Sequence, residues 1–203
     1  MRFTSIALIA TALFLSGCDD KSSPQASAPA PVAKPALTEQ QRSDLISTAT
    51  KDGFEVERDK VEKITFYSPK TNSSEWSNQY LGVYISVPDG KGPIFRIYPH
   101  YQGDDWIFFD HLKVLADNEI VYEKEYSSSD MRRDAKSSRV YESTDYAAKD
   151  DDIAAMRKIS SARSVTVRLS GRDHRQDFEM SQGDRQRIAR ALSAYDSLQP
   201  LSN

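Results

Sequence analysis

The strongest constraint on the fold is a series of short apolar runs with a period of two between residues 80 and 122. In the run 80–87, Leu81, Val83, Ile85 and Val87 share one side. Successive side chains of a strand point to opposite faces, so this pattern predicts strands with one buried face. Turn residues at 88–93, 102–105 and 117–118 separate the runs. Because these turns are short, we expect the strands to be antiparallel neighbours.

Helical patterns occur on both sides of these strands. The segment 38–53 opens with a capping box, in which Thr38 and Gln41 would satisfy free backbone donors. Asp150, Asp151 and Asp152 suit the N-terminus of a second helix, and Ser181 caps a third that ends near Leu198. Further strands are expected at 61–67, 139–143, 164–169 and 176–180. We predict an α+β fold, a twisted antiparallel sheet of about six to eight strands with two or three covering helices.

Two segments are assigned by composition alone. The polar stretch from Ser127 to Ser138 is expected to be a long exposed loop. The aromatic run that contains Trp106, Phe108 and Phe109 is expected to fill the core, because each ring buries a large apolar area.

The first 17 residues have the pattern of an export signal. Arg2 precedes an apolar run at 6–15, and small residues follow. The run is about half the roughly 20 residues that a membrane-spanning helix needs. We therefore expect residues 1–17 to be a signal peptide that is removed.

The end of this signal, Leu15-Ser16-Gly17-Cys18, resembles the lipobox of bacterial lipoproteins. The resemblance implies cleavage before Cys18, a diacylglyceryl group on its sulfur and palmitate-type acylation of its new amino group. Asp19 resembles the inner-membrane retention signal of enterobacterial lipoproteins. The implied location is the cell envelope of a bacterium, with the protein lipid-anchored and facing the periplasm. The remaining body resembles uncharacterised exported bacterial domains without a named family.

The mature chain is expected to have two parts. Residues 18–37 comprise the lipidated N-terminus and a tether rich in proline, serine and alanine. Some 18 residues of this tether, 19–36, would reach up to roughly 50 Å at about 3 Å per residue. Residues 38–203 form a single α+β globular domain. A net charge of −3 and a pI near 5.7 argue against a nucleic-acid partner. A mean hydropathy of −0.62 excludes a polytopic membrane protein.

The densest polar cluster in the sequence lies between residues 100 and 111. It contains His100, Asp104, Asp105, Asp110 and His111, residue types that ligate zinc or transfer protons. The spacing matches no helical His-x-x-x-His motif, and the aspartates suit the tip of a hairpin. Strand parity places His100 with Arg96 and Tyr98, opposite the apolar residues. We therefore predict a solvated hairpin and assign no metal, no cofactor and no catalytic residue.

The remaining polar groups favour binding over catalysis. His174 lies near Ser170 and Asp173, but no Gly-x-Ser-x-Gly elbow supplies a nucleophile for a triad. Acidic residues interleave with both basic patches, which favours solvated faces over lipid-binding sites; the patches comprise Arg132, Arg133, Lys136 and Arg139, and Arg185, Arg187 and Arg190. Trp76 stands in a polar stretch and is a candidate contact residue.

Three functional hypotheses follow. The leading one is a non-enzymatic, lipid-anchored periplasmic module that binds a protein or another envelope component. The second is a metal-dependent or acid–base hydrolase that uses His100, Asp105 or His111. The third is an envelope-exclusion factor of a mobile element. In all three, Cys18 carries the chain's contact with the membrane.

Overall fold

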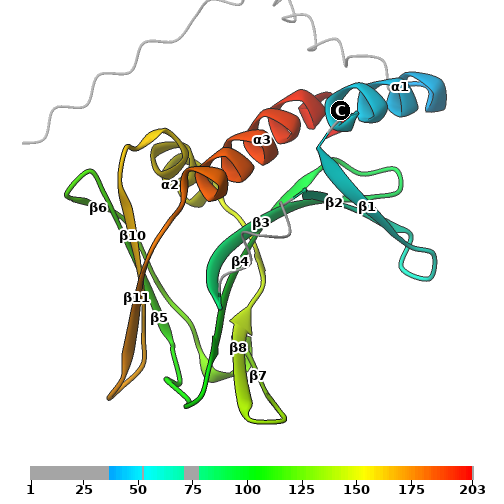
Figure 1. The fold of residues 1–203 in the computed structure, drawn as a ribbon. Coiled ribbons are helices and arrows are strands. Elements are labelled where there is room, and N and C mark those ends of the chain that lie inside the picture. Colours follow the sequence, from blue (N-terminus) through cyan, green and yellow to red (C-terminus); the bar gives the residue numbers. More distant parts are fainter. Residues whose placement is uncertain (1–36, 52, 71–77, 203) are drawn as a thin grey trace, which may run out of the picture. The chain divides into compact units, whose positions relative to one another are not determined.

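The computed structural model describes residues 37–51, 53–70 and 78–202 (Figure 1). These residues contain three α-helices and eleven strands, so the predicted α+β class is confirmed. The strands are antiparallel and form two separate sheets. Cys18 and Trp76 lie outside the described residues.

The larger sheet has seven strands, and six of them follow the order β1-β2-β3-β4-β8-β7. The short strand β9 also pairs with β4. The bounds are β1 (Phe54–Asp59), β2 (Ile64–Pro69), β3 (Gln79–Pro88), β4 (Ile94–Gly103), β7 (Met131–Lys136), β8 (Arg139–Thr144) and β9 (Tyr146–Ala147).

The smaller sheet has four strands in the order β11-β10-β5-β6. Asp117 and Asn118 form the tight turn between β5 and β6, and both have positive φ angles, as the commonest two-residue hairpins require. The bounds are β5 (His111–Ala116), β6 (Glu119–Glu125), β10 (Val165–Ser170) and β11 (Arg175–Glu179).

Each sheet buries one face under helices. Helix α3 (Gln182–Leu198) packs on β2, β3 and β4, while α2 (Asp150–Ser161) packs on β5 and β6. The two helices contact each other, and α1 (Glu39–Thr50) lies against α3 (Figure 1). The described residues also include two short 3-10 segments, at Ser128–Asp130 and Gln199–Ser202. Within the described residues, no helix combines the length and the apolar character that a membrane crossing requires.

The core confirms the predicted parity of β3 and β4. Val83 is opposite Ile97, and Ile85 is opposite Phe95, so all four side chains are buried on the face that α3 covers. His100 lies on the other face and is only partly buried. The caps at Thr38 and Ser181 are also confirmed, since each side chain accepts a hydrogen bond from a backbone N–H three residues later.

Three sequence predictions were wrong. The stretch 127–138 is not a loop, because residues 131–136 form β7 and pair with β8. Val61 does not begin a strand; it lies in the turn between β1 and β2 and is 86% exposed. Residues 100–111 are not a hairpin, because β4 and β5 belong to different sheets. The chain therefore crosses between the sheets at residues 104–110, which we call the crossing segment.

Candidate functional site

The crossing segment projects an aromatic side chain into solvent. Phe108 has a φ of +50° and is 54% exposed, whereas Phe109 beside it is fully buried. A bulky residue with positive φ is a strained conformation that persists only where the surroundings enforce it. The prediction that all three aromatic residues fill the core is therefore confirmed for Phe109 and wrong for Phe108. Trp106 packs against the edge of the core and is only partly buried.

A buried carboxylate enforces this conformation. Glu142 of β8 has no exposed surface, and its Oε1 accepts hydrogen bonds from the backbone N–H groups of Ile107 at 2.7 Å and Phe108 at 2.9 Å. Its Oε2 accepts a third from Phe109 at 2.9 Å. Three consecutive backbone donors thus converge on one anion, which fixes the backbone on both sides of Phe108.

Arg133 of β7 joins this carboxylate to the exposed ring. Its Nε lies 3.4 Å from Glu142 Oε2, and its Nη2 donates to the Phe109 carbonyl oxygen at 3.2 Å. The guanidinium carbon lies 5.6 Å from the centre of the Phe108 ring, within the range of a cation–π contact. Phe108 also stacks on Trp106, with ring centres 5.6 Å apart. We call Trp106 and Phe108 the aromatic pair.

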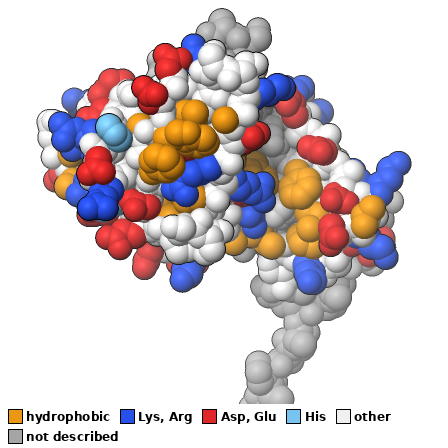
Figure 2. Space-filling model, turned by 90° about the horizontal axis from the view of Figure 1, so that it is seen from below, with side chains coloured by type: hydrophobic (Ala, Val, Ile, Leu, Met, Phe, Trp, Pro, Cys, Tyr) orange, Lys and Arg blue, Asp and Glu red, His pale blue; other side chains and the backbone are white. Residues whose placement is uncertain are grey.

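The aromatic pair lies at the end of the molecule where several turns gather. Figure 2, a view from below, shows a patch of hydrophobic side chains with Lys, Arg, His, Asp and Glu side chains around it. Phe108 has the largest side chain among the exposed large apolar residues in the described part of the chain. An exposed aromatic group on a rigid support is typical of a binding hot spot.

A second feature, the basic groove, adjoins the aromatic pair. It occupies about 540 Å³ over the exposed face of β5, β10 and β11. Gly171 on its floor packs so closely against the carbonyl groups of Ile107 and Phe108 that a Cβ would collide with them. The basic groove and the crossing segment are therefore in direct contact. The groove's basic side chains are His111, Lys113, Arg168, Arg172, His174 and Arg175.

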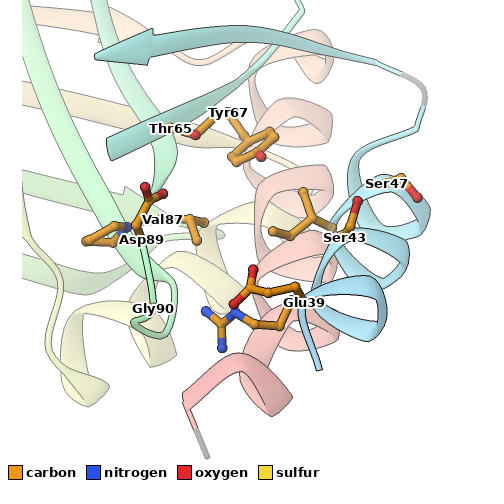
Figure 3. A pocket seen from close by; sticks show the side chains of 11 residues that line it. Glu39, Ser43, Ser47, Thr65, Tyr67, Val87, Asp89 and Gly90 are labelled. Carbon is orange, nitrogen blue, oxygen red and sulfur yellow. The ribbon is translucent and has the colours of Figure 1, made fainter. Parts of the chain in front are cut away.

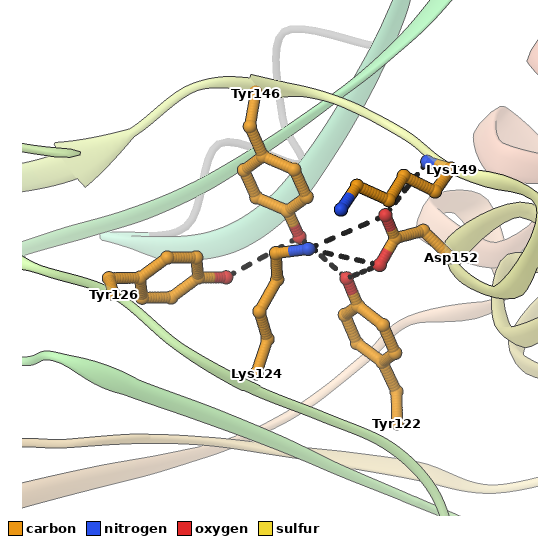
Figure 4. A network of polar contacts seen from close by, with 6 residues as sticks. All are labelled: Tyr122, Lys124, Tyr126, Tyr146, Lys149 and Asp152. Atoms are coloured by element: carbon orange, nitrogen blue, oxygen red, sulfur yellow. Dashed lines mark hydrogen bonds and ion pairs between the residues drawn. The ribbon is translucent and has the colours of Figure 1, made fainter.

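A network of tyrosines lies between the small sheet, α2 and β9 (Figure 4). Tyr122 donates to Asp152 Oδ1 at 2.6 Å, and its oxygen lies 2.9 Å from that of Tyr146. Lys124 Nζ lies 3.1 Å from Asp152 Oδ1 and 4.3 Å from the centre of the Tyr146 ring. Burial raises the pKa of Tyr122, Tyr126 and Tyr146, so these hydroxyls are neutral at pH 7. Every polar side-chain group in this network has a hydrogen-bond or ion-pair partner. The network therefore has a structural role in joining the small sheet, α2 and β9, and we call it the tyrosine joint.

Asp152 makes the contribution of the tyrosine joint to the free energy of unfolding dependent on pH in the acid range. Burial acts to raise its pKa, but the Lys149 N–H, the Tyr122 hydroxyl and the Lys124 ammonium outweigh that effect, so the pKa lies below its usual 3.8. A lowered folded-state pKa contributes stability above pH 3.8 that disappears as the pH falls through the folded-state value. We expect Asp152→Asn to lower the free energy of unfolding by about 2 kcal/mol at pH 7. The loss should shrink when urea denaturation is repeated at pH 3.

Asp151→Asn is the matched control for this prediction. Asp151 lies in the same first turn of α2 but is exposed, so its loss should cost no more than about 0.5 kcal/mol through the helix dipole. Equal destabilisation by both substitutions would show that the tyrosine joint contributes nothing specific.

The fourth feature is a groove of about 570 Å³ between α1 and the ends of β2 and β3. Figure 3 shows Glu39, Ser43 and Ser47 of α1 across from Tyr67 and Asp89. Asp89 is held by two hydrogen bonds from Arg58 at 2.7 and 2.8 Å. Arg42 donates to the carbonyl oxygens of Lys91 and Leu201, which ties α1 to the rest of the fold. These contacts indicate a structural role for the groove.

The structure separates the residues of the hydrolase hypothesis. His100 lies in the seven-stranded sheet and stacks on Tyr80 with ring centres 4.8 Å apart, and burial lowers its pKa. His111 lies in the four-stranded sheet, where its Nε2 is 3.0 Å from Glu123 Oε1. Asp105 is exposed on the crossing segment, and its carbonyl accepts a hydrogen bond from Tyr101. Within the described residues, no three His, Cys, Asp or Glu side chains are grouped to hold a metal ion.

Other sequence candidates fall into new surroundings. His174 and His111, 63 positions apart by number, line the same basic groove. Arg133 was assigned to a solvated patch but is partly buried against Glu142. Sequence reasoning missed Glu142 entirely, because an acidic residue in a polar strand normally points to solvent. The one sequence feature that indicated burial of Glu142 was strand parity, because Val140 and Glu142 share a face of β8.

Comparisons with protein-family models, curated proteins and solved structures gave no match to this chain.

Proposed function

We propose that this chain is a lipid-anchored periplasmic module without enzymatic activity, which binds another protein of the cell envelope through the aromatic pair. The observation that carries the proposal is the fully buried Glu142 carboxylate, whose three backbone hydrogen bonds hold Phe108 in solvent. Burying a carboxylate is costly unless it is paired and hydrogen-bonded. Here a buried carboxylate keeps an apolar ring exposed to solvent. This arrangement is consistent with a surface that contacts another protein.

The surroundings of the aromatic pair suit a protein partner. Large, stiff aromatic side chains next to an arginine are the residue types enriched in interface hot spots. The Arg133 guanidinium is already held by Glu142 and by the Phe109 carbonyl, so little further ordering is required on binding. A tether at residues 18–37 would hold the module within reach of its partner and raise the effective concentration near the membrane.

The test is capture of the partner by the full-length acylated protein after crosslinking in intact cells. We expect Trp106→Ala/Phe108→Ala to reduce recovery of the partner at least about 30-fold, the equivalent of about 2 kcal/mol for a hot-spot residue. Trp106 packs against the edge of the core, so the melting temperature of the double variant is measured as well. Phe108→Ala alone, at a side chain that is 54% exposed, should change the melting temperature little and still reduce recovery.

The matched control is Val61→Ala/Ile120→Ala, which removes two exposed apolar side chains elsewhere, 86% and 57% exposed. This variant should capture the partner as the unmodified protein does. The proposal fails if the unmodified protein yields no reproducible crosslinked protein, or if the two double variants lose capture equally.

A further inference from the structure

We infer that the basic groove is an anion site for a phosphate group, carried either by a phospholipid headgroup or by a free phosphate compound. This site adjoins the aromatic pair but uses other side chains, so the inference does not depend on the function proposed for the aromatic pair. The inference rests on the shape of the groove, on the state of its arginines and on the excess of basic over acidic side chains in its lining.

The shape follows from the register of the small sheet. Ser170 of β10 is opposite Arg175 of β11 on one side and His111 of β5 on the other. The next row places Arg168 beside Lys113. Side chains directly opposite in adjacent strands share one face, so long basic residues surround the small Ser170. Gly171 continues this floor where a larger residue would collide with the crossing segment. The result is a hollow of about 540 Å³ walled by cations.

Of the basic side chains in the groove, Arg172 and Arg175 have donors that no described residue uses, whereas His111, Lys113 and Arg168 are already paired. Lys113 and His111 share Glu123, and Arg168 is bound by Asp177 through two hydrogen bonds of 2.6 and 2.7 Å. Within the described part of the chain, the side chains of Arg172 and Arg175 make no hydrogen bond and no ion pair, although Arg175 lies near enough to Asp177 to help lower the pKa of that carboxyl. Asp173 is the one carboxylate among the described residues that line the groove. Arg172 and Arg175 therefore keep their guanidinium donors available for a ligand.

The chemistry favours phosphate over a metal ion. Lys113, Arg168, Arg172 and Arg175 outnumber the single acidic residue of the lining, Asp173. Because Lys113 and Arg168 already hold Glu123 and Asp177, the excess positive charge comes from Arg172 and Arg175, and it favours an anion over a metal ion. Guanidinium groups bind phosphate through paired N–H donors, and a tetrahedral phosphate offers acceptor oxygens in several directions at once. Such a group over Ser170 would be reached from the Arg172 turn and from Arg175. The histidines on either side can supply further ring N–H donors.

The three histidines of the chain provide a direct readout. The full-length mature protein, labelled with ¹³C at histidine Cε1 and held in an uncharged detergent, would be titrated at pH 7. The probes are inorganic phosphate, pyrophosphate and glycerophosphoglycerol, the headgroup of phosphatidylglycerol. We expect the His111 and His174 resonances to shift in a saturable way, with a Kd on the order of 0.1 mM for the best probe. His100, in the other sheet, serves as an internal control and should not move.

Matched variants distinguish binding at a specific site from general electrostatic attraction. Arg172→Ala/Arg175→Ala should weaken binding at least 10-fold, whereas Arg132→Ala/Arg163→Ala removes the same charge outside the groove and should leave the Kd within about twofold. Saturation by glycerophosphoglycerol would identify a lipid headgroup as the source, and saturation by pyrophosphate or phosphate alone a free compound. The inference is overturned if none of the probes shifts His111 and His174, or if both variants weaken binding equally.

Discussion

Substitution of Glu142 by alanine is expected to lower the free energy of unfolding by about 4 kcal/mol. The carboxylate accepts three backbone hydrogen bonds and lies beside Arg133 in a place without solvent. Its removal leaves buried donors without acceptors, and each such donor costs about 1–3 kcal/mol. It also leaves the Arg133 guanidinium without its carboxylate. The crossing segment should then lose the conformation that exposes Phe108.

Urea denaturation at pH 7 measures this effect, and Glu142→Gln covers the case in which the alanine variant does not fold. Glutamine keeps the size and one acceptor oxygen, but its NH₂ would face a backbone N–H, so we expect a loss of about 2 kcal/mol. Glu119→Ala, an exposed acidic residue at the start of β6, should cost less than about 0.5 kcal/mol.

Trp106 reports on the crossing segment directly. The chain has two tryptophans, so a Trp76→Phe background isolates the fluorescence of Trp106. In that background, Glu142→Gln should make Trp106 more accessible to acrylamide because its stacking on Phe108 depends on the same backbone. Unchanged quenching and unchanged stability together would show that Glu142 does not hold the aromatic pair in place.

Substitution of Cys18 by serine is expected to abolish acylation and with it the stable association of the chain with membranes. Each buried methylene contributes roughly 0.8 kcal/mol, so one acyl chain binds only marginally and two or more give a stable anchor. Serine lacks the sulfur that would carry the diacylglyceryl group. Metabolic labelling with palmitate and the intact mass of the mature chain measure the change.

Asp19→Ser is the control for this experiment. It keeps Cys18 and should retain the label, while sucrose-gradient fractionation should show a shift away from the inner membrane. An unmodified thiol at Cys18 in the mature protein, or a mature N-terminus at another residue, would refute the lipoprotein assignment and remove the anchor from the proposed function.

The sequence alone determined the helix caps, the strand alternation and the Asp117-Asn118 turn of this protein. Thr38 and Ser181 cap their helices through contacts within three residues. The alternation in β4 places Phe95 and Ile97 in the core and His100 on the other face. Asp117 and Asn118 form the predicted turn. Such features could be read from the chain because their causes, side-chain periodicity and short-range hydrogen bonds, lie within a few residues.

Only the tertiary structure decided where the strands pair and what the crossing segment displays. Glu142 reaches Ile107 across 35 residues, and His111 meets the 170–175 turn through the register of β5 and β10. From residue type alone, an acidic side chain is expected in solvent and a phenylalanine in the core. In the fold, Glu142 is buried and Phe108 is exposed. The physical reason is that burial follows from the packing of distant strands, and that packing is set by the whole core and not by any local pattern.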